Sequence, residues 1–323
     1  MEILAEIGIF FFIIFAISIF ITYNLIKKFH NKKEIVNVFT IKNKKRKMKD
    51  LLFNILFSPV YWIVQIGIIA SFCLILLSLM IQYFNYSEEQ ALAVFLASGL
   101  ISFSIAIMYA TIIWITDYKH KEPLAMFPTL FLWGCTAAVL SFFINTSIIY
   151  GFGYSQINSV IVSPFVEEGL KIIGLLILSK SRKFNGIFDG LVFGFIIGTG
   201  FAFIEDWVYY TQNSPIGIGI YEWVSFIFAR SILAGAGHGI FTAIAGAGIA
   251  IAKERKEIKW TIFGFVGAVL IHSIFNYLSI IDGISRYAVD TRIHFSSLYL
   301  AIMLILFSIL FFELWKKEEK SVC

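Results

Sequence analysis

The chain contains a series of apolar runs, most of them about 20 residues or longer, separated by short polar segments. A run of this length crosses the hydrocarbon core of a bilayer as an α-helix. Hydrophobic residues make up 59% of the 323 residues and charged residues only 15%, which excludes an ordinary soluble domain. The sequence therefore predicts an all-α polytopic membrane protein with about nine transmembrane helices, at residues 4–26, 57–84, 91–116, 125–148, 158–179, 188–210, 223–252, 260–281 and 295–313.

The basic residues are distributed unevenly between the two sides of these spans. Of the 26 Lys and Arg residues, 22 fall in alternate connecting segments or in the C-terminal tail, and only Arg286 and Arg292 lie on the opposite side. Since cytoplasmic loops carry the excess of Lys and Arg, the N-terminus is predicted outside and the C-terminus in the cytoplasm. The net charge of +5 thus reflects topology, and we expect no nucleic-acid partner.

The densest basic segment runs from Lys27 to Lys49. We expect it to be a cytoplasmic loop that contacts anionic lipid headgroups, or one that acts only as a topology signal. It belongs to an N-terminal two-span extension, residues 1–96, which precedes a catalytic core at 97–281 and a last span and tail at 282–323. A composition rich in Ile, Phe, Lys and Asn favours a multi-pass protein of a prokaryotic plasma membrane.

Two adjacent glutamates, Glu167 and Glu168, and Lys171 interrupt the apolar run 159–178. Charge at this depth costs roughly 2.5 kcal/mol or more per residue, so such groups indicate function by default. Adjacent helical residues point about 100° apart, and we expect one glutamate to face the site and the other to pair with Lys171. The alternative is structural, an ion pair that only holds two helices together.

Later spans carry further polar groups at similar depth. Glu205 is followed by Asp206, His238 lies in the next span, and His272 and Asn276 are four residues apart and share a helical face. Each could be a hydrogen-bonding group between helices. Glycines spaced by four, at Gly190, Gly194 and Gly198, predict close helix packing rather than catalysis. The next span has two small-residue faces, and His238 is expected to point away from part of the tight contact.

These segments resemble the successive motifs of the PrsW family of intramembrane proteases, which is related to the CAAX prenyl endopeptidases. The resemblance covers about residues 100–281 and includes, in order, Asp117 to Leu124, Pro164 to Lys171, Asp189 to Gly194, Gly200 to Glu205, His238 to Ala243 and His272 to Tyr277. It implies an intramembrane peptidase that cleaves a membrane-anchored, anti-sigma-factor-like protein on its outer side, a site-1-type cleavage. Carried over by position, the catalytic candidates are Glu167, Glu168, Glu205, His238, His272 and Asn276. In the CAAX branch a histidine stands where this chain has Glu205.

Carboxylates and imidazoles in one low-dielectric pocket can activate a water and stabilise an oxyanion. We expect Glu167, with Glu205 or His238, to deprotonate the water, and His272 with Asn276 to stabilise the oxyanion. Zinc is the candidate cofactor, with His238, His272 and Glu205 as ligands. The chain has no His-x-x-x-His pair on one helix, so an obligatory metal is not expected. The alternatives are an ion-coupled transporter or proton relay, and a non-catalytic scaffold of the same superfold.

Overall fold

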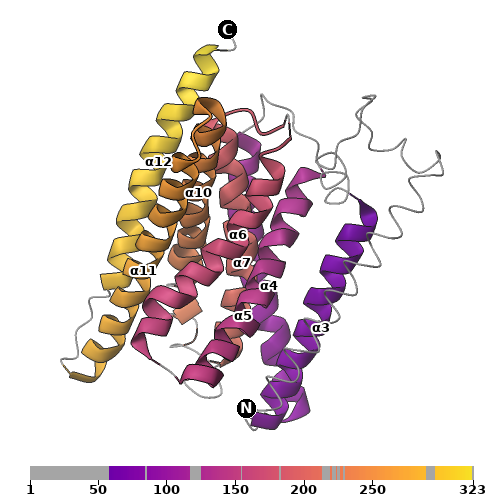
Figure 1. Ribbon diagram of the computed structural model, residues 1–323. Coiled ribbons are helices and arrows are strands. Elements are labelled where there is room, and N and C mark those ends of the chain that lie inside the picture. Colours follow the sequence, from indigo (N-terminus) through magenta and orange to yellow (C-terminus); the bar gives the residue numbers. More distant parts are fainter. Residues whose placement is uncertain are drawn as a thin grey trace.

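The computed structural model describes residues 58–83, 86–116, 125–153, 155–181, 183–212, 219, 223, 226–227, 230–288 and 295–321. They form a bundle of α-helices (Figure 1). The helices are α3 (Pro59–Tyr83), α4 (Glu88–Thr116), α5 (Met126–Phe152), α6 (Ser163–Leu178), α7 (Ile187–Gln212), α10 (Gly235–Arg255), α11 (Lys259–Ala288) and α12 (Phe295–Ser321), with two five-residue π-helices, η3 (Asn158–Val162) and η4 (Arg230–Ala234).

Seven of these helices are long and apolar enough to cross a membrane, so the chain is a polytopic membrane protein. The expected span at 4–26 and the basic loop at 27–49 lie outside the described residues. The expected span at 158–179 is not one continuous α-helix. The π-helix η3 forms its first turn, and α6, which follows, is only 16 residues long. Pro164 stands in the first turn of α6, where its missing N–H breaks no helical hydrogen bond.

Helix α7 forms the centre of the bundle and packs against α4, α5 and α10 (Figure 1). In its most apolar stretch 94% of the residues are buried, compared with 17% in α11 and in α12. The peripheral helices instead expose large apolar side chains such as Leu270, Leu298 and Ile309. Since lipid covers such surfaces in a membrane protein, the surrounding described helices separate most of α7 from lipid.

Three glycines bring α7 against the backbone of α10. A Cβ atom added at Gly190 would meet the carbonyl oxygen of Gly246, and one added at Gly198 would meet that of His238. Gly194 lies in the same way against Thr242. Both small-residue faces of α10 take part, because the carbonyl oxygen of His238 and the Cα atoms of Gly239 and Ala243 all lie against α7. Small residues allow this approach, which holds His238 at a fixed height beside α7.

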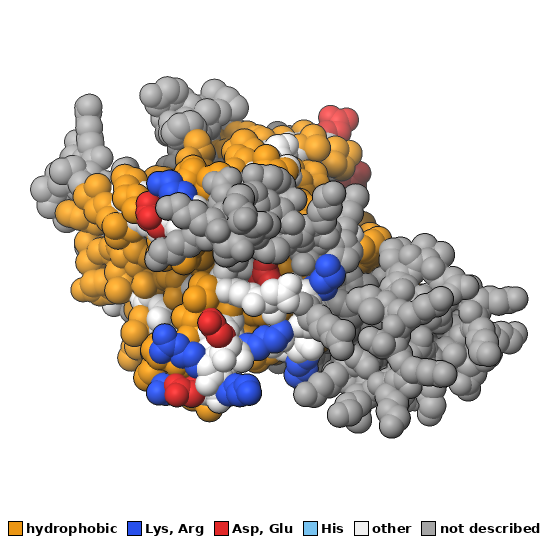
Figure 2. Space-filling model, turned by 90° about the horizontal axis from the view of Figure 1, so that it is seen from above, with side chains coloured by type: hydrophobic (Ala, Val, Ile, Leu, Met, Phe, Trp, Pro, Cys, Tyr) orange, Lys and Arg blue, Asp and Glu red, His pale blue; other side chains and the backbone are white. Residues whose placement is uncertain are grey.

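At one end of the bundle, the described segments that connect α6 to α7 and α10 to α11 contain several Lys and Arg residues. Figure 2 shows Lys and Arg side chains gathered on this face. Lys253, in the last turn of α10, donates hydrogen bonds of 2.7 Å each to the backbone oxygens of Ser181 and Phe184. Helix α10 ends at Arg255, and the left-handed φ of 58° at the next residue, Lys256, turns the chain toward α11. These contacts join the α6–α7 and α10–α11 connections at the same end.

Candidate active site

Glu168 is the more enclosed of the two adjacent glutamates, with an exposed fraction of 0%. Its Oε1 lies 2.7 Å from Lys171 Nζ and 3.1 Å from His272 Nδ1. Its Oε2 accepts a hydrogen bond of 3.0 Å from the Thr242 hydroxyl. One glutamate was expected to pair with Lys171, and Glu168 does so. It therefore connects α6 to α10 and α11.

Glu167 is also buried, but its carboxylate has free hydrogen-bonding capacity. Asn145 Nδ2 donates to Oε1 over 3.3 Å. Oε2 has no hydrogen-bond partner, and His272 Nε2 lies 3.7 Å from it. A buried carboxylate oxygen without a partner is energetically unfavourable. Such an atom is suited to bind a water, a substrate group or a metal ion.

Glu205 of α7 and His238 of α10 lie beside the two glutamates of α6. Glu205 Oε2 lies 2.6 Å from His238 Nε2 and 3.1 Å from an Arg230 guanidinium nitrogen. Arg230 Nε also pairs with Asp206 Oδ1 at 2.8 Å, and its guanidinium stacks 3.5 Å from the centre of the Tyr209 ring. The planar fork of arginine suits this double contact. Arg230 therefore fixes the carboxylates of two neighbouring residues of α7.

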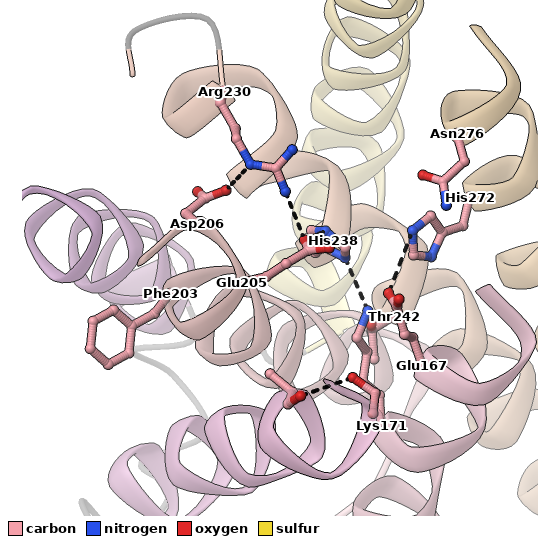
Figure 3. Close-up of polar contacts among 12 residues, drawn as sticks. Glu167, Lys171, Phe203, Glu205, Asp206, Arg230, His238, Thr242, His272 and Asn276 are labelled. Carbon is pink, nitrogen blue, oxygen red and sulfur yellow. Dashed lines mark hydrogen bonds and ion pairs between the residues drawn. The ribbon is translucent and has the colours of Figure 1, made fainter. Parts of the chain in front are cut away.

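Figure 3 shows these side chains converging from α6, α7, η4, α10 and α11, with Phe203 directed away from them. A cavity of about 440 Å³ lies beside the polar group, and Glu167, Glu205, Arg230, His238 and Asn276 all line it. Apolar side chains such as Phe142, Ile149 and Val208 complete its wall. Glu167, Glu205 and His238 therefore share one cavity, as the proposed chemistry requires of carboxylates and imidazoles from several helices.

The remaining sequence candidates take other positions around the cavity. His272 contacts Glu168 through Nδ1, and its Nε2 lies 3.7 Å from Glu167 Oε2. Asn276 lines the cavity, but its amide donates 2.9 Å to the backbone oxygen of Ser159 in η3. This bond holds the π-helical turn before α6 against α11. It is a bond between helices, of the kind that the sequence left open for Asn276.

Three polar groups of the site were not identified from the sequence as site residues: Asn145, Asp206 and Thr242. Asn145 lies in an apolar run of α5, and Thr242 follows His238 by one helical turn. Both are intramembrane polar residues, which is the signal that could have found them. The contacts of Arg230 with Glu205 and Asp206 of α7 arise from tertiary packing.

The donor atoms around Glu167 fit a metal ion. Glu167, His238 and His272 each offer one ligand atom, and these atoms lie within 4.8 Å of one another. Catalytic zinc takes three protein ligands of this kind and keeps a fourth position for water. The acidic side chains of the cluster, Glu167, Glu168, Glu205 and Asp206, also outnumber its basic ones, Lys171 and Arg230.

The chain is similar to known bacterial proteases. Residues 122–310 match the PrsW family of intramembrane metalloproteases. Protease PrsW of Oceanobacillus iheyensis is 23% identical over 212 residues, 63% of this chain and 88% of that protein. Protease PrsW of Clostridioides difficile is 26% identical over 180 residues, 51% and 72% of the two chains. Protease PrsW of Bacillus subtilis is 28% identical over 130 residues, 39% and 56% of the two chains. No solved structure matches the chain.

Proposed function

Since this chain belongs to the PrsW family of intramembrane metalloproteases, we propose that it cleaves a membrane-anchored, anti-sigma-factor-like protein near the outer membrane surface. The chain is a multi-pass membrane peptidase. Its substrate, its cleavage site and the roles of its residues are our proposal. The family and its protease relatives favour this function over the transporter and scaffold alternatives.

The observation that carries the proposal is the free oxygen of Glu167. Glu167 Oε2 is buried, has no hydrogen-bond partner and faces His272 Nε2 across 3.7 Å. A water that lies to one side of the line joining these atoms can bond both. A carboxylate so placed acts as a general base, a role worth about 10² to 10⁴ in rate. We assign Glu167 to bind the attacking water and to take its proton.

The neighbours of His272 suit it to hold this water. Its Nδ1 lies 3.1 Å from Glu168 Oε1. An ionised carboxylate has no proton to donate, so it can only accept this hydrogen bond. A neutral His272 therefore carries its proton on Nδ1 and turns the lone pair of Nε2 toward Glu167. This arrangement supports a water-holding role for His272 in place of the oxyanion role expected from the sequence.

Zinc fits the same two residues, because Glu167 Oε2 and His272 Nε2 both have free lone pairs. Histidine ligands commonly donate their other N–H to a carboxylate, as His272 does to Glu168. Zinc, when bound there, would supply Lewis-acid polarisation of the scissile carbonyl. Glu205 would then be the remaining carboxylate beside the cavity, with a side chain that is 22% exposed.

The depth of the site supports cleavage near the outer surface. Helix α7 begins at Ile187, beside the basic connections, and Glu205 lies 18 residues further along. At about 1.5 Å per residue this is roughly 27 Å, close to the full thickness of the hydrocarbon core. With the basic end in the cytoplasm, as the charge distribution predicts, the site lies toward the outer leaflet.

The proposal is tested by comparing membrane proteomes of cells that express the wild-type chain, Glu167→Gln or Glu313→Gln. Glu313 is an exposed carboxylate of α12 paired with Lys316, and it serves as the matched control. We expect a membrane-anchored protein to lose its outer domain with the wild type and the control, and to stay intact with Glu167→Gln. Identical proteomes for Glu167→Gln and the wild type would refute the proposal.

A further inference from the structure

The ammonium group of Lys171 is fully buried, and three neighbours account for its three N–H bonds. It lies 2.7 Å from Glu168 Oε1, 3.1 Å from His238 Nδ1 and 3.7 Å from the centre of the Phe201 ring. The carboxylate, the imidazole and the face of the ring each accept from a cation. Glu168 is itself 0% exposed.

The contact with Lys171 determines which nitrogen of His238 carries a proton. An ammonium group only donates hydrogen bonds, so His238 Nδ1 must be the acceptor. A neutral imidazole has one N–H, which therefore lies on Nε2. Nε2 is in contact with Glu205, 2.6 Å from its Oε2, and a carboxylate can accept from this N–H.

His272 has the opposite arrangement. Its Nδ1 is the donor, to Glu168 Oε1 at 3.1 Å, and its Nε2 keeps the lone pair. Glu168 links the two histidines, because the Oε1 that contacts His272 also accepts a hydrogen bond of 2.7 Å from Lys171, the residue that contacts His238. The two imidazoles lie with ring centres 5.0 Å apart and planes at 89°. The site thus contains one imidazole that donates through Nε2 and one that accepts through it.

We propose that Lys171 is a positioning residue that holds His238 as the Nε2–H tautomer, so that His238 serves as a hydrogen-bond donor in the cavity and not as a metal ligand. The inference rests on the proposed peptidase function. His238 then donates to Glu205 in the resting site and to the carbonyl oxygen of the substrate as negative charge develops there. Within the metal-binding group, Glu167 and His272 keep their lone pairs for a metal ion or for water.

The ion pair between Glu168 and Lys171 therefore has more than a structural role. A lysine that only joined two helices would act equally well without contacting His238. Here Lys171 reaches from α6 to an imidazole of α10, 67 residues away in sequence. Replacement of Lys171 by methionine keeps an unbranched apolar side chain that is one atom shorter, and it removes all three N–H donors.

The experiment is ¹⁵N NMR of the full chain in lipid, labelled with ¹⁵N at histidine. The chain has five histidines, and the signals of His238 are assigned by their loss in His238→Gln. We expect the directly bonded proton on Nε2 in the wild type and in the control Lys316→Met, an exposed lysine of α12. In Lys171→Met we expect signals of the Nδ1–H form of His238 to appear.

A wild-type spectrum with the proton of His238 on Nδ1 would overturn the proposal, whether or not Lys171→Met folds. It would also be overturned if Lys171→Met folded and left the signals of His238 unchanged. The spectra require no substrate and no bound metal. Failure of the peptidase proposal, by contrast, would appear in the membrane proteomes and leave these spectra unaffected.

Discussion

Substitution of Gly198 by alanine tests whether close packing of α7 and α10 sets the catalytic geometry. The new Cβ would lie 2.7 Å from the Cα of Gly239 and still closer to the carbonyl oxygen of His238, whereas ordinary contacts are 3.4–4 Å. Both neighbours are backbone atoms, so no side chain can move aside. The two helices must therefore separate locally by about 1 Å, since overpacked sites relax through backbone shifts.

The separation acts directly on the site. The distance from His238 Nε2 to Glu205 Oε2 is 2.6 Å, and an increase of about 1 Å takes it beyond hydrogen-bond length. Misplacement of a catalytic group by this amount costs about 10²-fold in rate. Overpacking costs about 1–3 kcal/mol in the free energy of unfolding. We expect both losses in Gly198→Ala.

The free energy of unfolding is measured by titrating the protein in mild detergent micelles with SDS and following tryptophan fluorescence. Cleavage is followed with the substrate found in the membrane proteomes. The matched control is Gly67→Ala in α3, where an added Cβ meets nothing within 4 Å and helix propensity predicts a gain of up to about 1 kcal/mol. If Gly198→Ala is as stable and as active as Gly67→Ala, the proposed role of this packing is refuted.

Three further predictions concern single side chains. Glu167→Gln is expected to lower the single-turnover cleavage rate by about 10² to 10⁴ with insertion unchanged, and a rate within tenfold of wild type would contradict its role as base. Asn276→Ala removes the 2.9 Å bond to Ser159 and is expected to cost about 1 kcal/mol in the SDS titration with less than a tenfold loss of cleavage, whereas a loss as large as that of Glu167→Gln would make Asn276 catalytic. Arg230→Lys retains the charge but loses the fork that reaches Glu205 and Asp206, and one lost charged bond of about 1.5 kcal/mol predicts roughly tenfold slower turnover; unchanged kinetics would exclude a positioning role for Arg230.

Local geometry made part of the site predictable from the sequence. Glu168 and Lys171 are three residues apart on a helix, and such pairs meet wherever the helix forms. The chemical type of the site also followed from the sequence, because carboxylates and imidazoles at membrane depth are costly without a partner or a function. The motif order then indicated the family that the comparisons identify.

Contacts between helices were not predictable in the same way. Asn145 approaches Glu167, and Thr242 approaches Glu168, only because α5 and α10 pack beside α6. Hydropathy also failed to show where α6 begins. The residues of η3 are as compatible with an α-helix as with a π-helix, because the two differ in backbone hydrogen bonding and not in apolar content.

The burial of α7 has a consequence for the response of the protein to its lipid. A bilayer that is thicker or thinner than the apolar length of a helix acts on the helices that touch it, mainly by changing their tilt. In this chain α11 and α12 form much of that outer contact, whereas α7 is almost wholly enclosed. A change of acyl-chain length should therefore reorient the outer helices first and leave Glu205 and its neighbours on α7 at their original depth.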